Sequence, residues 1–280
     1  DLTQKDRDRA QHALALDFLK AGLLDRAEAA LRQLEHSAFA DEAHQALLGI
    51  FERARDWPQA LVVAEQLDQR HAGAYRTRIT HFLCEMAALA TKRQALDEAM
   101  ALLEKARARA PEAPRPAVEI AALQQLLAQP DAALDTLLAL RTEHPPSQPL
   151  VAHPIAQLAQ QTGRSEQVRQ RLQALQPAPP SLDVTEAIAS LSPNASAARA
   201  SYLQHLESEP SLVVASRWLA GQTLGDAAQQ AVVLRALEQA TVPLKRYRCA
   251  ACGFEAKQYF WQCPGCQNWD SYPTRRIEEL

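Results

Sequence analysis

The stretch AGLLDRAEAAL at residues 21–31 shows the pattern that decides the fold. It places a small residue, Ala27, in an amphipathic segment soon after a glycine, and related stretches return along most of the chain. The equivalent positions, called reference residues below, are Ala27, Ala60, Ala99, Ala133, Val168 and Ala198. The steps between them are 33, 39, 34, 35 and 30 residues. A nearly constant step of this length indicates a chain built from repeated structural units.

The residues on either side of these positions indicate how each unit is built. Twelve residues before the first five reference residues lies a small or apolar residue of a preceding helix: Ala15, Leu48, Ala87, Ala121 and Ala156. At the sixth unit Glu186 breaks this rule. Twelve residues after the last four reference residues comes a proline, which ends a helix: Pro111, Pro145, Pro180 and Pro210.

This arrangement resembles the tetratricopeptide repeat, in which two helices cross closely at small residues. Gly22 and Gly163 match the glycine of its turn. A generic helical bundle would also contain amphipathic helices and is the alternative, but it does not explain a constant period. The sequence therefore predicts an all-α fold, a superhelical solenoid of tetratricopeptide repeats.

Seven helix pairs are expected from these positions. They are 4–21 with 24–36, 39–54 with 57–70, 74–92 with 95–109, 115–128 with 130–143, 149–162 with 165–176, 182–190 with 195–208, and 212–221 with 226–240. The long step of 39 residues predicts an insertion near residues 90–94. Composition agrees with helix, because the chain is 47% apolar but has only 8 glycines and 5% aromatic residues.

Charge and hydropathy limit the classes of function. The net charge is −3 and the isoelectric point is near 6.3, so nothing global favours a nucleic-acid-binding surface. No apolar run reaches the roughly 18 residues of a membrane-spanning helix. Because the chain begins with Asp1 rather than methionine, we expect it to be a processed or shortened form of a longer protein.

Composition changes at Pro243, which divides the chain into a helical array at 1–242 and a small module at 243–280. The module holds two C-x-x-C pairs: Cys249 with Cys252, and Cys263 with Cys266. Each pair supplies two thiolates from a tight turn, and four sulfur ligands suit one zinc or iron ion. No histidine follows residue 246, so the expected site contains only sulfur ligands.

The module is too small to fold on an apolar core alone, so metal binding and aromatic packing are expected to stabilise it. Gly253 suits a left-handed backbone position, and two short strands are expected near 246–249 and 257–262. Trp261 and Trp269 favour docking of the module on neighbouring helices. Two disulfides or a redox-active pair are the alternatives, but the sequence indicates neither an oxidising compartment nor a thioredoxin-like setting.

The sequence shows no catalytic constellation, so we expect a non-enzymatic protein that binds partner proteins. In a helical solenoid the first helix of each pair lines the concave surface. The candidate partner-binding residues on these helices are Arg9, His12, Lys20, Gln45, Arg53, His81, Lys92, Arg115 and His153. Their mild basic excess suits an acidic protein segment, whereas the simpler interpretation is a solvated helix face.

Two other classes of function remain open at this point. A nucleic-acid-binding zinc ribbon would use the basic residues of the module: Lys245, Arg246, Arg248, Lys257, Arg275 and Arg276. Against it stand the acidic residues of the same region: Glu255, Asp270, Glu278 and Glu279. A redox-responsive scaffold is the second alternative, because an iron ion held by four thiolates can exchange one electron.

The motifs YRCAACGF at 247–254 and WQCPGCQNW at 261–269 are similar to a shortened rubredoxin-type pair of metal-binding knuckles. A rubredoxin-like module behind a tetratricopeptide array resembles the lipopolysaccharide assembly protein B family. The resemblance covers essentially the whole chain, including AGLLDRA at 21–27, HFLCE at 81–85 and PTR at 273–275.

This resemblance implies that the four cysteines of the module match the metal ligands of the family. It also implies an adaptor that acts with the membrane-bound FtsH protease to promote degradation of the lipid A deacetylase LpxC. A further implied partner is an inner-membrane protein that senses lipopolysaccharide; no nucleic acid is expected. The family has an N-terminal membrane anchor, with repeats and module on the cytoplasmic side of the bacterial inner membrane. We expect this chain to be its soluble cytoplasmic fragment.

Overall fold

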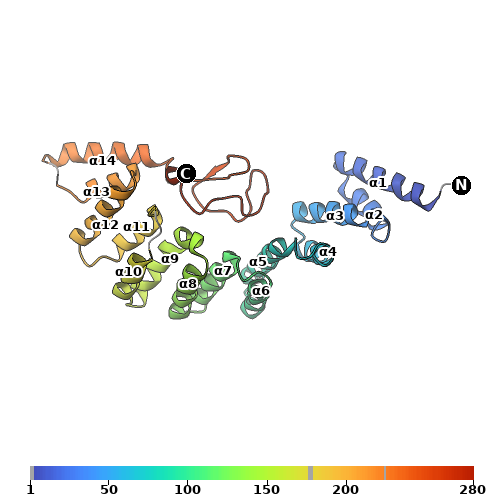
Figure 1. Ribbon diagram of the computed structural model, residues 1–280, viewed down its shortest axis with the longest axis horizontal. Coiled ribbons are helices and arrows are strands. Elements are labelled where there is room, and N and C mark those ends of the chain that lie inside the picture. Colours follow the sequence, from blue (N-terminus) through green and yellow to red (C-terminus); the bar gives the residue numbers. More distant parts are fainter. Residues whose placement is uncertain (1–2, 176–178, 224) are drawn as a thin grey trace. The chain divides into compact units, whose positions relative to one another are not determined.

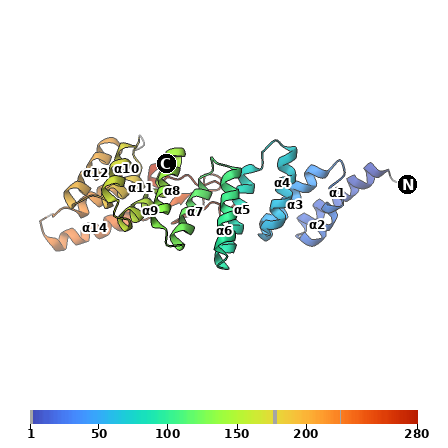
Figure 2. The same ribbon diagram turned by 90° about the horizontal axis from the view of Figure 1, so that it is seen from below.

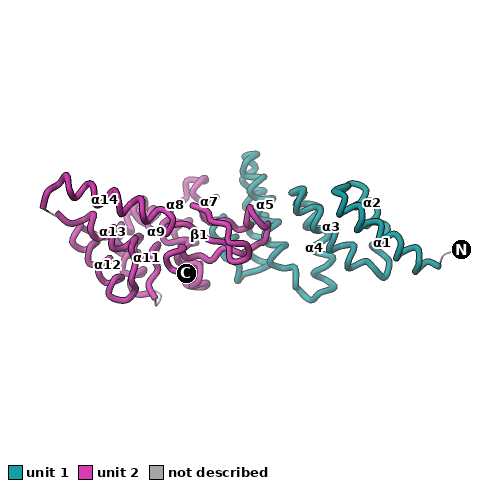
Figure 3. Tube along the Cα trace, turned by 90° about the horizontal axis from the view of Figure 1, so that it is seen from above, with its two compact units in different colours: residues 1–119 teal, residues 120–280 magenta. Residues whose placement is uncertain are grey.

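The computed structural model describes residues 3–175, 179–223 and 225–280, and over these residues the chain folds into fourteen α-helices and one small β-hairpin (Figure 1). Consecutive helices from α1 to α6, and again from α8 to α14, pack against each other. The chain divides into two compact units, residues 1–119 and 120–280 (Figure 3). The predicted all-α fold of tetratricopeptide repeats with a small four-cysteine module is confirmed.

Unit 1 contains the first three helix pairs and the start of α7; Figure 2 labels these helices from α1 to α7 along the ribbon. Its helices are α1 (Gln4–Lys20), α2 (Leu24–Arg32), α3 (Ala40–Ala54), α4 (Trp57–Arg70), α5 (Arg76–Lys92) and α6 (Leu96–Arg109). The boundary between the units falls within α7 (Pro114–Leu126). None of the helices in the described parts of the chain combines the length and the apolar run that crossing a bilayer requires.

Unit 2 holds the remaining helices and the cysteine module. Its elements after α7 are α8 (Pro130–Glu143), the short 3₁₀ helix η1 (Pro145–Ser147), α9 (Gln148–Gln161), α10 (Ser165–Ala174), α11 (Leu182–Ser190), α12 (Ala195–Ser208), α13 (Leu212–Ala220), α14 (Ala227–Thr241), β1 (Tyr247–Arg248), β2 (Glu255–Ala256) and the 3₁₀ helix η2 (Ile277–Glu279). The two strands pair antiparallel, with Tyr247 opposite Ala256.

The turn inside a helix pair has the same backbone geometry in the first five helix pairs. One residue there is left-handed in each, with these φ angles: Gly22 73°, Arg55 55°, Gln94 61°, Ala128 57° and Gly163 70°. The N–H of the next residue donates to a carbonyl five positions earlier, at 2.8–3.0 Å, which is the Schellman arrangement that ends a helix. Each left-handed residue lies five positions before its reference residue, so the backbone keeps the repeat register even where the glycine is lost.

Burial follows the same register. The first five reference residues are at most 1% exposed, and the residues twelve positions before them are at most 2% exposed. Nine of these ten side chains are no larger than valine, with Leu48 as the exception, so the paired helices can approach closely. The sixth pair departs from the rule, because Ala198 and Glu186 are only half-buried. Five positions before Ala198 the chain has Pro193, whose ring excludes the left-handed backbone of the other turns.

All seven predicted helix pairs are present, with boundaries that differ by a few residues. The largest difference is α2, which ends at Arg32 instead of residue 36; the predicted end of the helix at 165–176 lies outside the described residues. The predicted insertion near 90–94 is wrong, because the turn at Gln94 keeps the common geometry. The extra residues lie mainly in α5, which has 17 residues where α7 has 13 and α9 has 14. The segment before α5, residues 71–75, is only one residue longer than the matching segment 110–113.

A buried histidine packs between α11 and α12. His205 is 2% exposed, and its Nδ1 lies 2.8 Å from the hydroxyl of Thr185. Burial lowers the pKa of His205 below its usual range, although the carboxylates of Glu209 and Glu278 act in the opposite direction. The folded protein therefore binds this proton more weakly than the unfolded chain does.

The buried position of Ala99 predicts a loss of stability when its volume grows. Ala99→Leu places a larger side chain at a fully buried point of α6, and we expect the free energy of unfolding to fall by about 1–3 kcal/mol. Urea denaturation followed by circular dichroism measures the change. Ala101→Leu is the matched control on the exposed side of the same helix and should change stability by less than about 0.5 kcal/mol. Equal losses in both variants would contradict this account of the helix crossing.

The burial of His205 predicts a pH dependence of stability. Since its pKa is lowered in the folded state, the stabilisation is complete above about pH 6.5 and is lost as the pH falls below that value. Between pH 7 and pH 5 the free energy of unfolding should therefore fall because of this group. Urea titrations at several pH values give the free energy of unfolding as a function of pH. The variant His205→Gln should lose the part of this pH dependence that His205 causes. His36→Gln, at an exposed position, should retain it.

Candidate metal centre

The first cysteine pair lies in a tight turn between β1 and β2. The backbone N–H of Cys249 donates to the carbonyl of Phe254, and the N–H of Gly253 donates to the carbonyl of Cys249, both at 2.9 Å. Gly253 has a φ of 78°, which confirms the left-handed position expected from the sequence. The turn reverses the chain at once, so the second strand lies at 255–256 and not at the expected 257–262.

The second cysteine pair repeats this geometry. The N–H of Cys263 donates to the carbonyl of Asn268 at 2.9 Å, and the N–H of Gln267 donates to the carbonyl of Cys263 at 2.8 Å. Gln267, with a φ of 61°, occupies the position that Gly253 has in the first pair. Gly265 serves another purpose, because a Cβ there would lie 3.3 Å from the side chain of Phe254. The two turns thus pack directly against each other.

The four sulfur atoms converge on one point. Cys249 Sγ lies 3.8 Å from Cys266 Sγ, and Cys252 Sγ lies 3.7 Å from Cys263 Sγ; all four lie within 4.8 Å of one another. A tetrahedral ion with metal–sulfur bonds of about 2.3 Å separates its ligands by roughly 3.8 Å. The cluster therefore fits a single metal ion, and both zinc and iron accept four sulfur ligands in this geometry. The cysteines are free thiols, at separations far above a disulfide bond length.

Hydrogen bonds prepare the cluster for a cation. Burial opposes ionisation of Cys249, but the hydroxyl of Ser271 at 3.3 Å and the backbone N–H groups of Cys252 and Ala251 lower its pKa to about 6. At Cys252 the N–H of Phe254 favours the thiolate, yet burial and the three neighbouring sulfur atoms raise the pKa to about 12. Burial also opposes ionisation of Cys263, yet the backbone N–H groups of Cys266 and Gly265 lower its pKa. A metal ion must still displace the proton that Cys252 holds.

Tyrosine side chains pack around the cysteines, as expected for this module. The ring of Tyr259 meets those of Tyr247 and Tyr272 edge-to-face, with centroid distances of 5.6 and 6.2 Å. Tyr272 donates its hydroxyl to the carbonyl of Phe254 at 3.2 Å and lies 3.9 Å from Cys263 Sγ. One phenol therefore links both cysteine turns.

The last residues of the chain, 274–280, tie the module to helices of the same unit; this segment is called the tail. Thr274 donates its hydroxyl to the carbonyl of Pro146, just before α9, at 2.7 Å. Arg275 donates to the carbonyl of Pro179, before α11, at 3.0 Å. The expected docking of the module on neighbouring helices is thus confirmed, and the tail makes these contacts.

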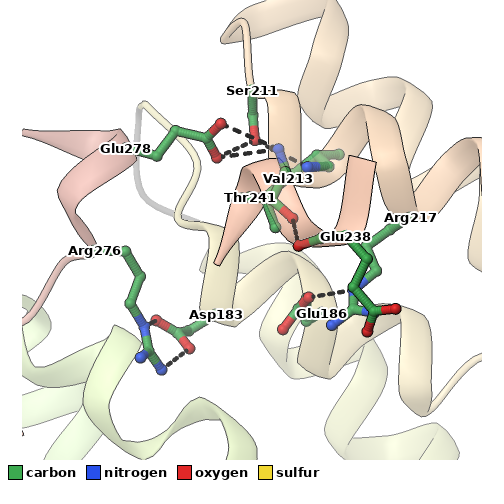
Figure 4. Close-up of polar contacts among 10 residues, drawn as sticks. Asp183, Glu186, Ser211, Val213, Arg217, Glu238, Thr241, Arg276 and Glu278 are labelled. Atoms are coloured by element: carbon green, nitrogen blue, oxygen red, sulfur yellow. Dashed lines mark hydrogen bonds and ion pairs between the residues drawn. The ribbon is translucent and has the colours of Figure 1, made fainter. Parts of the chain in front are cut away.

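Two carboxylates of the tail, those of Glu278 and Glu279, lie at the N-terminal ends of helices, and Figure 4 shows that of Glu278 beside Ser211 and Val213. Glu278 accepts hydrogen bonds from the backbone N–H groups of Leu212 and Val213, at 2.6 and 3.1 Å, and from the hydroxyl of Ser211 at 2.7 Å. Glu279 accepts from the N–H of Leu182 at 2.9 Å. The first turns of α13 and α11 have free N–H groups and a partial positive charge, which these carboxylates satisfy.

Arg276 joins the tail, α11 and the first strand. Its guanidinium donates to both oxygens of Asp183, at 2.9 and 2.7 Å, and to the carbonyl of Lys245 at 3.0 Å. It also stacks 4.1 Å from the ring centroid of Tyr247. Burial raises the pKa of Asp183, while the ion pair with Arg276 opposes that rise. A bidentate pair of this kind fixes the orientation of the tail.

The basic residues considered for nucleic-acid binding are mostly engaged within the chain. Arg246 and Arg248 form ion pairs with Glu255 at 3.5 and 3.1 Å, while Arg275 and Arg276 make the tail contacts described above. Four of the six basic side chains are therefore held by carboxylates or carbonyls. This arrangement disfavours a phosphate-binding surface on the module.

Seven of the nine predicted partner-binding residues lie on first helices with exposed or half-exposed side chains. They are Arg9, His12 and Lys20 on α1, Gln45 and Arg53 on α3, Lys92 on α5, and His153 on α9. The ring of His12 also stacks on Phe39 at a centroid distance of 4.8 Å. These positions stay predictions of a binding face.

The structure corrects the other two, His81 and Arg115, which are only 1% and 4% exposed. Arg115 donates to Glu85 at 2.7 Å and to Glu119 at 2.6 Å, and it lies 3.2 Å from His81 Nδ1. Counting helix positions assigned both residues to the open face. In the structure they form a buried ion cluster between α5 and α7, so their role is to join neighbouring helices.

Sequence reasoning missed the tail contacts and their partner, Asp183. The paired residues are 93–97 positions apart for α11 and 65–67 apart for α13, so no local pattern shows them. One signal was present. The segment RRIEE at 275–279 places two basic and two acidic residues beside an apolar one, which is typical of a specific docking segment more than of a uniform basic patch.

Comparison with known proteins agrees with this organisation. Residues 247–272 match the family described as "Rubredoxin metal binding domain". Lipopolysaccharide assembly protein B of Escherichia coli K12 is 29% identical over 292 aligned positions, which cover 100% of this chain and 74% of that protein. The protein of the same name from Haemophilus influenzae is 25% identical, covering 94% of this chain and 68% of that protein. The solved structure of PilF from Pseudomonas aeruginosa is 18% identical, with a TM-score of 0.36 over 78% of this chain and 99% of that one.

The link between the sulfur cluster and the tail predicts a remote effect of metal removal. A chelator, or the variant Cys249→Ser/Cys252→Ser, should loosen the tail, because only Pro273 separates the tail from Tyr272, which packs beside Cys263. Hydrogen exchange at the N–H groups of Leu182, Leu212 and Val213 should then become at least about tenfold faster. Exchange in α5 and α6 of unit 1 serves as the internal control and should not change. Unchanged protection at the three amides after loss of the metal would contradict this link.

Proposed function

Because the chain belongs to the lipopolysaccharide assembly protein B family, we propose that it is a non-enzymatic adaptor in lipopolysaccharide synthesis that binds partner proteins through its helical repeats. The observation that carries the proposal is the docking of a metal-binding module on a repeat array by the tail. A metal site that braces helices serves to hold a binding surface in shape more than to carry out chemistry.

The proposed partners are the FtsH protease, the deacetylase LpxC and an inner-membrane protein that senses lipopolysaccharide. In this proposal the adaptor brings the deacetylase to the protease and so limits the first committed step of lipid A synthesis. It acts at the cytoplasmic face of the bacterial inner membrane, to which a segment outside this chain attaches it. The family resemblance supports these partners and this location.

Four cysteines are proposed to bind one zinc or iron ion: Cys249, Cys252, Cys263 and Cys266. Their spacing and their hydrogen bonds support this role. The proposed functional division is a repeat array at 1–242 and a metal module at 243–280. Visible absorbance of protein purified without added metal distinguishes iron from zinc, because only iron–thiolate centres are coloured.

The exposed basic residues of the first helices are proposed to contact acidic segments of these partners. Lys20 and Arg53 represent them in unit 1, on α1 and α3. Rim charges of this kind affect the association rate and the salt dependence of binding.

A pull-down from bacterial lysate tests the proposal. The tagged chain should recover the protease or the deacetylase, and the charge reversal Lys20→Glu/Arg53→Glu should lower that recovery at least about fivefold. The matched control is Arg26→Glu/Arg107→Glu, which reverses two exposed charges on second helices and should leave recovery unchanged. Recovery of nucleic acid alone, with neither protein, would overturn the adaptor function.

A further inference from the structure

The tail crosses the N-terminal ends of three successive first helices. Thr274 reaches the residues before α9, Arg275 and Glu279 reach the start of α11, and Glu278 reaches the start of α13. First helices are also the elements that provide the binding surface of a repeat array. The tail therefore lies as a peptide ligand would lie, on elements suited to binding peptides.

Most of these contacts are made with the backbone of the helices, so they do not depend on which side chains the helices carry. Glu278 and Glu279 are held by the backbone N–H groups of Leu182, Leu212 and Val213. The hydroxyl of Ser211 adds one further donor at 2.7 Å. Such donors recognise any carboxylate that reaches them with the right spacing, whether it comes from this chain or from another.

A second observation comes from the residue just before α11. Ser181 is fully buried, yet its hydroxyl has no hydrogen-bond partner, and it makes no capping bond to the first turn of its own helix. The serine before a helix normally accepts such a bond. The backbone N–H of the next residue, Leu182, donates to the carboxylate of Glu279. The start of α11 is thus adapted to an external carboxylate.

We propose that the tail is a displaceable occupant of a peptide-binding strip, formed by the N-terminal ends of α11 and α13, and that this strip takes partner segments carrying two adjacent carboxylates. The inference rests on the proposed adaptor function and names the class of segment that the repeats bind at this place. The attached tail competes at an effective concentration in the millimolar range, so a free segment binds well only when the tail is weakened.

Titration of a fluorescent peptide with the sequence PTRRIEEL, residues 273–280, into the full chain tests the proposal. The variant Glu278→Gln/Glu279→Gln should bind this peptide at least about tenfold more tightly than the unmodified chain, because its own tail holds the strip less well. The peptide PTRRIQQL should bind to neither chain. The matched control is Glu255→Gln, which removes a carboxylate of the module outside the tail and should keep the affinity of the unmodified chain.

Equal affinity of PTRRIEEL for the variant and the unmodified chain, or equal binding of PTRRIQQL, would overturn the proposal. If the double variant does not fold, hydrogen exchange on the unmodified chain at millimolar PTRRIEEL decides the question. The N–H groups of Ile277 and Glu278 should then exchange faster while those of Leu212 and Val213 stay protected. An unchanged tail under saturating peptide would refute displacement.

The peptide assays need neither the protease nor the deacetylase, so the two proposals can fail separately. Recovery of partners without peptide binding would remove this inference and leave the adaptor function. Peptide binding without recovery of partners would support this inference and contradict the adaptor function.

Discussion

The close crossing of two helices at small residues is the constraint on which the rest of this structure depends. A helix pair can bury its apolar faces only if the turn between the helices brings them together at one fixed register. The left-handed turn residue and its Schellman hydrogen bond set that register in the first five helix pairs. Buried small residues such as Ala60 and Ala133 then allow the two backbones to approach. This repeated geometry places the first helices from α1 to α9, and the tail docks mainly on α11 and α13, beyond the last of these turns.

The cysteine module depends on the array as much as it contributes to it. Four thiols in a segment this small need a cation to hold them together, so metal binding is part of the folding free energy of the module. The tail passes this stability on to the helices, since Glu278, Glu279 and Arg276 end at α13 and α11. The charges involved are mostly shielded from solvent, and removing one partner would leave another unpaired. We therefore expect the metal centre and the last helices to unfold together.

The sequence predicted the helix pairs and the sulfur cluster because both have local signatures. Small residues recur with a constant step, and paired cysteines have a fixed spacing. The turn geometry at Arg55, Gln94 and Ala128 was hidden, because a Schellman turn needs a backbone conformation and not a particular side chain. The burial of Arg115 was hidden too, because its carboxylate partners come from two different helices. Contacts between distant residues, such as that of Arg276 with Asp183, leave no periodic pattern to detect.

The position of the tail also affects how the chain matures during synthesis. A ribosome makes the polypeptide from its N-terminus, so the helices of unit 2 emerge before the residues that complete them. Until residues 274–280 leave the exit tunnel, the starts of α11 and α13 lack the carboxylates of Glu279 and Glu278. A product that lacks residues 274–280 would keep its four metal-site cysteines but lose the contacts of the tail with α11 and α13. Residues 274–280 therefore complete these helix starts late in synthesis, and we expect a copy that stops before them to present loosened helices to cellular proteases.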